Sequence, residues 1–231
     1  MYKKFAFTLA EVLITLGIIG VVAAMTLPTL IQNYRKHIVE TRLAKFYSTI
    51  NQAIKLAEVE YGDKKVWSNV GHGYVTDEND EPTNESIPLA WVNKYLKPYL
   101  NGAEVSVTTN GNAFIKFSDG SAAVFSNQGI QFWPESKDFV DLTTAAELKK
   151  VQGYKTFAFL LVPYDCSENY KYHCDKGVEP YAYSLANDDE ESIRNHAIMG
   201  CNTNPSHSAA FCTKLIQMNG WKIPKDYPHK F

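Results

Sequence analysis

Apolar residues dominate the first part of the chain and then recur with helical spacing. Residues 12–31 form a predominantly apolar run of 20, which at about 1.5 Å per residue matches the roughly 30 Å hydrocarbon core of a bilayer. Apolar side chains then continue at steps of three and four, at Ile38, Leu43, Phe46, Tyr47, Ile50, Ala53, Ile54 and Ala57. This spacing is typical of one face of a helix. We therefore predict a single helix over 7–61, stopped at Gly62 and transmembrane at about 12–31.

The middle of the chain changes to a period of two. Residues 113–118 and 121–126 flank Asp119-Gly120, which predicts a β-hairpin with a tight turn of the type that Asp-Gly favours. Further strands are predicted at 104–109, 129–133 and 156–163, and short helices at 88–100, 143–151, 188–199 and 208–218. An antiparallel sheet packed on one long helix is an α+β arrangement. We expect a globular α+β domain over 62–231, with Trp221 and Ile223 covering part of its core.

One acid, Glu11, lies directly before the apolar run. A carboxylate inside a membrane-length helix costs roughly 2.5–3.5 kcal/mol on insertion scales, which makes Glu11 a candidate functional residue. The alternative is that Glu11 merely lies in the first turns of the helix, where the macrodipole favours an acid by about 0.3–1 kcal/mol. Basic residues stand on both sides of the run, at 3–4 and 35–36, so charge bias leaves the orientation open.

The start of the chain, K-K-F-A-F-T-L-A-E-V-L-I at 3–14, resembles the signature of type IV prepilins and type II secretion pseudopilins. A secretory signal peptide fits less well, since its small-residue cleavage site follows the apolar core, whereas Ala6 precedes it. The resemblance implies a leader at 1–6, cleavage by a prepilin peptidase between Ala6 and Phe7, and N-methylation of Phe7. Family members usually carry glycine before the cut, where this chain has Ala6. The fifth mature residue of the family is glutamate, which is where Glu11 stands.

The resemblance also implies how the protein works. The subunit would stand in the bacterial inner membrane as a single-pass protein with its domain periplasmic or extracellular. A platform protein and an ATPase would then move it into a filament of pilin or pseudopilin subunits. There Glu11 would pair with the amine of Phe7 on a neighbour, since charge attraction grows as the dielectric falls, and a subunit out of register would leave both charges uncompensated. Pro28, the 22nd residue from Phe7, agrees with a family proline and is interpreted as a helix kink. Whether the filament is a secretion pseudopilus or a minor, major or DNA-uptake pilus stays open.

The formal net charge of the chain is -2, and loss of the leader lysines makes it more acidic. No basic field for nucleic acid is evident. Sequence spacings typical of catalysis, such as G-x-S-x-G, H-E-x-x-H or a P-loop, are missing, and the six histidines are scattered. We therefore expect neither an enzyme nor a cofactor.

Two clusters near the end of the chain offer candidate chemistry. Four cysteines in a segment that would face the periplasm or exterior indicate disulfides, and we favour Cys166 with Cys174 and Cys201 with Cys212 because each pair closes a short loop. The competing interpretation is a structural zinc site with His173 beside Cys174, which fits poorly because no C-x-x-C pair occurs. A second cluster, Asp188, Asp189 and Glu190, is a weak calcium candidate; alternatively, these acids fill the first turn of a helix.

Two other functional classes compete with the filament subunit. One is a membrane-anchored binding protein of the cell exterior that never polymerises. The other is a secreted hydrolase behind an atypical signal sequence, for which the mature chain would begin after the apolar run, near Ala24 or later. The mature N-terminus separates these classes.

Overall fold

The computed structural model describes residues 8–127, 129–141, 144–161, 177–182 and 189–231. In chain order its elements, with short 3-10 helices labelled η, are α1 (Leu9–Tyr61), η1 (Lys64–Val66), β1 (Tyr74–Thr76), β2 (Pro82–Ser86), α2 (Ile87–Tyr95), η2 (Lys97–Tyr99), β3 (Glu104–Val107), β4 (Ala113–Lys116), β5 (Ala122–Ser126), β6 (Gly129–Trp133), η3 (Ser136–Asp138), α3 (Ala145–Lys149), β7 (Phe157–Leu161), β8 (Val178–Pro180), α4 (Glu190–Asn195) and α5 (Cys212–Met218). The fold is the predicted α+β class.

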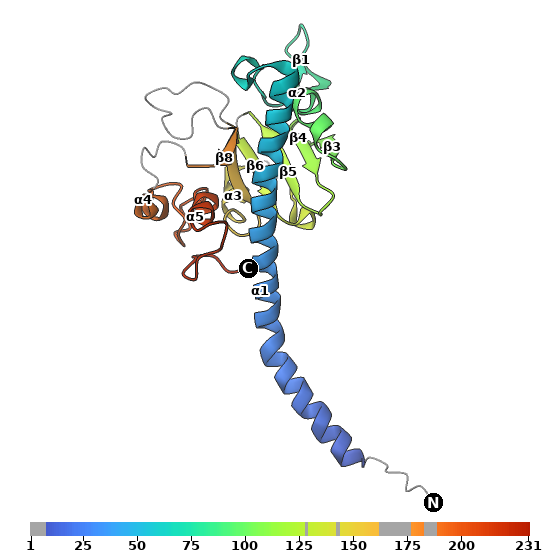
Figure 1. The fold of residues 1–231 in the computed structure, drawn as a ribbon, viewed down its shortest axis with the longest axis vertical. Helices are drawn as coiled ribbons and strands as arrows, with labels where there is room; N and C mark the ends of the chain where they lie inside the picture. Colours follow the sequence, from blue (N-terminus) through green and yellow to red (C-terminus); the bar gives the residue numbers. More distant parts are fainter. Residues whose placement is uncertain (1–7, 128, 142–143, 162–176, 183–188) are drawn as a thin grey trace, which may run out of the picture.

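The predicted long helix is confirmed as α1. Figure 1 shows its second half lying along the domain while its first half projects away from it. The helix ends at Gly62, which has a φ of 77° and donates its N–H to the carbonyl of Glu58. Glycine adopts such a positive φ without the steric cost that other residues meet. The predicted stop is therefore a backbone requirement of this turn.

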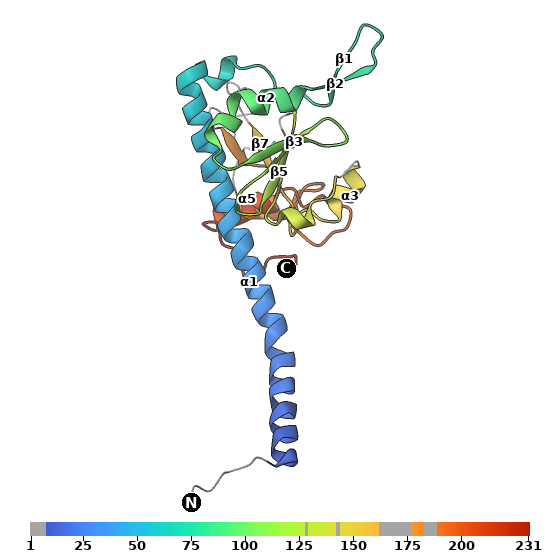
Figure 2. The same ribbon diagram turned by 90° about the vertical axis from the view of Figure 1, so that its right-hand side faces the viewer.

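The main sheet is fully antiparallel in the order β3-β4-β5-β6-β7-β8. The strands predicted at 104–109, 113–118, 121–126 and 129–133 are confirmed, as is the described part of the strand at 156–163. A separate β1–β2 hairpin projects from the end of the domain farthest from the N-terminus (Figure 2). The sequence did not predict β1, β2 or β8, because β1 and β8 are three residues long and β2 reads P-T-N-E-S without a clear apolar face.

The predicted β4–β5 hairpin forms with a longer turn than expected. Gly120 donates its N–H to the carbonyl of Phe117, and Phe117 donates to the carbonyl of Ser121. Gly120 has a φ of 81°, whereas Asp119 is not among the residues with positive φ. A two-residue turn of the predicted kind needs positive φ at both central positions. The chain instead makes a three-residue loop in which only the glycine is left-handed.

The core lies between α1 and one face of the sheet. Seven residues of α1 are buried at helical spacing: Val39, Leu43, Phe46, Ile50, Ala53, Ile54 and Ala57. The ring of Phe46 stacks on Phe132 at 4.3 Å and meets Phe159 edge-on at 5.0 Å. Because offset and edge-on aromatic pairs add about 0.5–1.5 kcal/mol beyond burial, this cluster fixes how α1 sits on the sheet.

The predicted short helices are present but shorter than expected. The helix predicted at 88–100 is α2 followed by η2, a break next to Pro98, which has no N–H to continue the hydrogen bonding. The three later helices are α3, α4 and α5, of five, six and seven residues. After α5 the chain returns to α1, where Trp221 and Ile223 pack against the core as predicted.

Candidate functional site

The first turn of α1 is held by two residues of the N-terminal motif. The Thr8 hydroxyl accepts the N–H of Glu11 at 3.3 Å, and the Glu11 carboxylate accepts the N–H of Thr8 at 2.8 Å. This reciprocal arrangement is a capping box, which satisfies two donors that a helix start would otherwise leave unpaired. Ala6 and Phe7 lie outside the described residues, so the predicted cleavage, methylation and charge pair stay predictions.

The first half of α1 touches nothing else in the described chain that would bury it. None of its most apolar 18-residue window is buried, and the helix is long and apolar enough to cross a membrane. Large side chains along it, such as Leu9 and Met25, are 78% and 74% exposed. An apolar helix inside a soluble core would be covered, so this exposure favours a lipid or protein partner for the segment.

Pro28 lies inside this exposed segment, and α1 continues through it. Figure 1 shows α1 curving along the part that projects from the domain. Proline has no N–H, so the carbonyl one turn earlier loses its partner. The predicted kink at Pro28 stays a prediction about the packed or membrane-bound helix.

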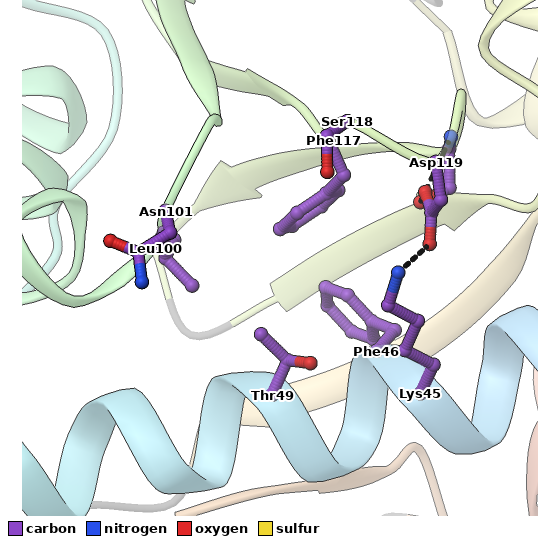
Figure 3. A pocket seen from close by; sticks show the side chains of 9 residues that line it. Lys45, Phe46, Thr49, Leu100, Asn101, Phe117, Ser118 and Asp119 are labelled. Carbon is purple, nitrogen blue, oxygen red and sulfur yellow. Dashed lines mark hydrogen bonds and ion pairs between the residues drawn. The ribbon is translucent and has the colours of Figure 1, made fainter.

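The second half of α1 is tied to the β4–β5 turn by charged groups. Arg42 donates to the backbone carbonyls of Asp119 and Pro134. Lys45 lies 2.9 Å from the Asp119 carboxylate, and both residues line a small pocket of about 70 Å³ (Figure 3). Burial raises the pKa of Asp119, but hydrogen bonds from Ser121 and Lys45 outweigh it and hold that pKa below its usual value. The exposed first half of α1 is thus continuous with a second half that these contacts hold against the sheet.

Two family models divide the chain between them. A model of the prokaryotic N-terminal methylation motif matches residues 1–27, which confirms the prepilin-type motif. The second model describes a family of unknown function, DUF6613, and matches residues 29–231. The chain belongs to DUF6613. No curated protein and no solved structure matches this chain. The motif and the long apolar helix fit a pilin-type subunit anchored in a membrane.

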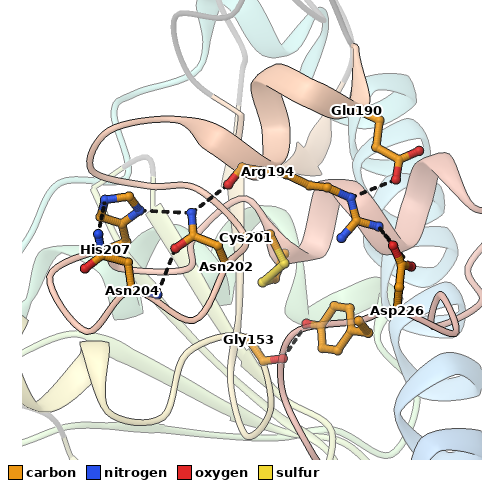
Figure 4. The surroundings of a disulfide bond; sticks show 10 residues. Gly153, Glu190, Arg194, Cys201, Asn202, Asn204, His207 and Asp226 are labelled. Atoms are coloured by element: carbon orange, nitrogen blue, oxygen red, sulfur yellow. Dashed lines mark hydrogen bonds and ion pairs between the residues drawn. A yellow bond between two sulfur atoms is a disulfide. The ribbon is translucent and has the colours of Figure 1, made fainter.

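Within the DUF6613 region, Cys201 and Cys212 form the predicted disulfide (Figure 4). The pair is therefore not a source of thiolate ligands for zinc, although an imidazole nitrogen of His229 lies within 4.8 Å of both sulfurs. Burial lowers the pKa of His229. Cys166, Cys174 and His173 lie outside the described residues.

The acidic cluster of the DUF6613 region is used to build α4. Asp189 caps this helix, accepting the N–H of Ser192 at 2.8 Å, and Glu190 accepts from Arg194 at 2.8 Å. Arg194 also reaches Asp226 at 3.1 Å (Figure 4). These contacts match the helix-start interpretation of the acids, while Asp188 lies outside the described residues.

Sequence reasoning missed Thr8 as the partner of Glu11. The pattern Thr-x-x-Glu ahead of an apolar run is the ordinary signal of a capping box and was sufficient to find it. It also missed Asn51, whose amide binds the backbone of β8 with 2.8 Å and 2.9 Å bonds to Val178. No local pattern marks that contact, since Val178 is 127 residues away.

Proposed function

We propose that the chain is a non-enzymatic prepilin-type filament subunit, either a pseudopilin of a type II secretion system or a minor type IV pilin. The observation that carries the proposal is continuity: the methylation motif at 1–27 opens an exposed apolar helix that runs without a break into the domain core. A length of 231 residues suits a minor or divergent subunit.

In this proposal the helix works in two environments. A prepilin peptidase removes residues 1–6 at the cytoplasmic face, and the amine of Phe7 is methylated. The apolar half of α1 spans the inner membrane until a platform protein and an ATPase draw the subunit into the filament, where neighbouring helices replace the lipid. The domain, whose core includes residues 39–57 of α1, stays outside throughout.

Mass spectrometry of the mature N-terminus tests this proposal. We expect a product that begins with methylated Phe7 in cells that contain a prepilin peptidase, and the uncut chain in cells that lack it. A mature chain that begins near Ala24 or later would instead support a secreted protein. Retention of residues 1–6 in cells with the peptidase would refute the filament subunit.

Glu11 allows a sharper test of assembly. Gln keeps the capping box with Thr8 but removes the charge, so Glu11→Gln and Glu11→Ala should both be processed and both fail to enter filaments. Thr8→Ala is the matched control, because it removes the cap at a cost of about 0.5–2 kcal/mol but keeps the acid; it should still assemble. If Glu11→Gln assembles while Glu11→Ala and Thr8→Ala do not, the acid acts through capping and the charge pair is refuted.

A further inference from the structure

A pocket of about 200 Å³ lies where the globular domain meets the exposed half of α1. It is lined by residues from four parts of the chain: α1, the segment 134–138 after β6, the segment before β7 and the C-terminus. They include Arg35, Lys155 and Lys230. Figures 1 and 2 show the C-terminus beside α1 at the edge of the domain that faces the projecting helix. The pocket therefore lies at the end of the domain nearest the segment that would cross the membrane.

The length of α1 between the apolar run and the domain determines how far this pocket lies from the hydrocarbon core of the membrane. The apolar run ends at Ile31, and the pocket is lined by Arg35 and Val39, which stand roughly 6 and 12 Å further along a helix. The headgroup layer on each side of a bilayer is about 5–8 Å thick. If residues 12–31 span the hydrocarbon, the mouth of the pocket lies among the headgroups. Tyr34, 64% exposed, lies at the level where tyrosines favour the membrane interface.

The pocket is lined by three cationic and two acidic side chains. Its acids have partners: Glu135 pairs with Lys137, and Asp138 lies 3.9 Å from Lys155. Arg35 and Lys230 make no ion pair with any residue that the structure describes. Two exposed cations at the rim of a cavity suit the oxygen atoms of a phosphate, which a guanidinium binds through paired hydrogen bonds.

We propose that this pocket binds the phosphate of an anionic phospholipid headgroup while the subunit stands in the bilayer. The proposal rests on the membrane span proposed above. Each Lys or Arg close to an anionic membrane contributes about 1 kcal/mol, or roughly fivefold in binding. This contact would fix the orientation of the domain relative to the membrane. A subunit that moves into a filament must release the lipid phosphate.

The test is lysine acylation of the full chain in lipid nanodiscs, followed site by site with mass spectrometry. We expect Lys230 to react several-fold more slowly in discs that contain phosphatidylglycerol than in discs of phosphatidylcholine alone. Lys97, an exposed residue of η2 at the far end of α1, should react equally in both. Added salt should restore the reactivity of Lys230, because it screens exposed charges.

A pair of variants separates the pocket from general charge attraction. Arg35→Gln should abolish the protection of Lys230, whereas Lys36→Gln, the neighbouring cation that does not line the pocket, should leave it intact. Equal relief by both variants, or equal acylation of Lys230 in the two kinds of disc, would overturn the lipid site. Comparable protection by inorganic phosphate in detergent would also overturn it, in favour of a free-anion site. A chain that does not float with lipid would refute the membrane span itself, a distinct result.

Discussion

Asn51 connects the long helix to the edge of the sheet. Its side-chain amide donates to the carbonyl of Val178 at 2.8 Å and accepts the N–H of Val178 at 2.9 Å. One side chain thus occupies the position of a further strand beside β8, whose outer backbone groups would otherwise lack partners. Val178 is fully buried, so these two hydrogen bonds have no ready replacement from water.

Replacing Asn51 should therefore destabilise the fold more than its partial exposure suggests. We expect Asn51→Ala to lower the free energy of unfolding by about 1–3 kcal/mol, because buried polar groups of Val178 lose their partners. Gln52→Ala is the matched control: Gln52 is exposed, and among the described residues its amide bonds to Ser48 alone, at 3.2 Å, so its effect should stay within about 0.5 kcal/mol. Urea unfolding of the full chain in detergent measures both, and equal effects would contradict the proposed role of Asn51.

The contact between α1 and the β4–β5 turn depends on the charge of Asp119. Since hydrogen bonds from Ser121 and Lys45 hold the pKa of Asp119 below its usual value against the effect of burial, the folded protein binds this proton less tightly than the unfolded chain. The stabilisation is thus complete above about pH 4 and is lost as the pH falls through the lower, folded-state pKa.

The pH dependence of Asp119→Asn follows from this sign. At pH 6 the variant should unfold at a lower urea concentration than the wild type, because it loses the charge that pairs with Lys45. The two midpoints should converge as the pH falls from about 4 through the lower, folded-state pKa of Asp119, where the wild-type carboxyl also becomes neutral. Urea midpoints measured from pH 6 down to about pH 2 check the effect. A gap that stays constant across this range would show that the packing of Asn, and not charge, causes the difference.

At the level of elements, the sequence correctly predicted those helices and strands that are determined by a local pattern of apolar residues. The spacing of Leu43, Phe46 and Ile50 predicts α1, and alternation predicts β4 to β6, because one face of each is buried. Strand β8 was missed because only three residues define it and its outer edge is completed by Asn51 from α1. The predicted turn was of the wrong type. Arg42 and Lys45 both bind Asp119, and a dipeptide preference does not include such long-range contacts.

The candidate site was predictable to a similar degree. Glu11 and the apolar run follow from composition and spacing alone, and the Thr8 cap follows from a known local pattern. The pocket at Arg35 and Lys230 was beyond prediction, since these residues are far apart in the chain and meet only when the C-terminal tail returns to α1.

At the scale of the whole molecule, the described residues form two apolar clusters that share strand β7. Phe157 and Phe159 face the main core with α1, whereas Ala158 between them belongs to a smaller cluster with α4 and α5. This division follows from alternation along a strand. The smaller cluster includes both Cys201 and Cys212, and its two helices have only six and seven residues. Helices this short depend on tertiary contacts. We therefore expect the disulfide to be a main stabilising contact of this cluster.

Removal of the disulfide should therefore loosen one part of the molecule and spare the other. In the double variant Cys201→Ala, Cys212→Ala we expect a loss of about 2–4 kcal/mol and lower hydrogen-exchange protection in α4 and α5. Protection in β4, β5 and β6 should change little, because the main core remains intact. The control is Thr203→Ala, Ser206→Ala, two exposed positions in the same loop, which should leave both regions as in the wild type. Loss of protection throughout the sheet would instead mean that the two clusters unfold as one cooperative unit.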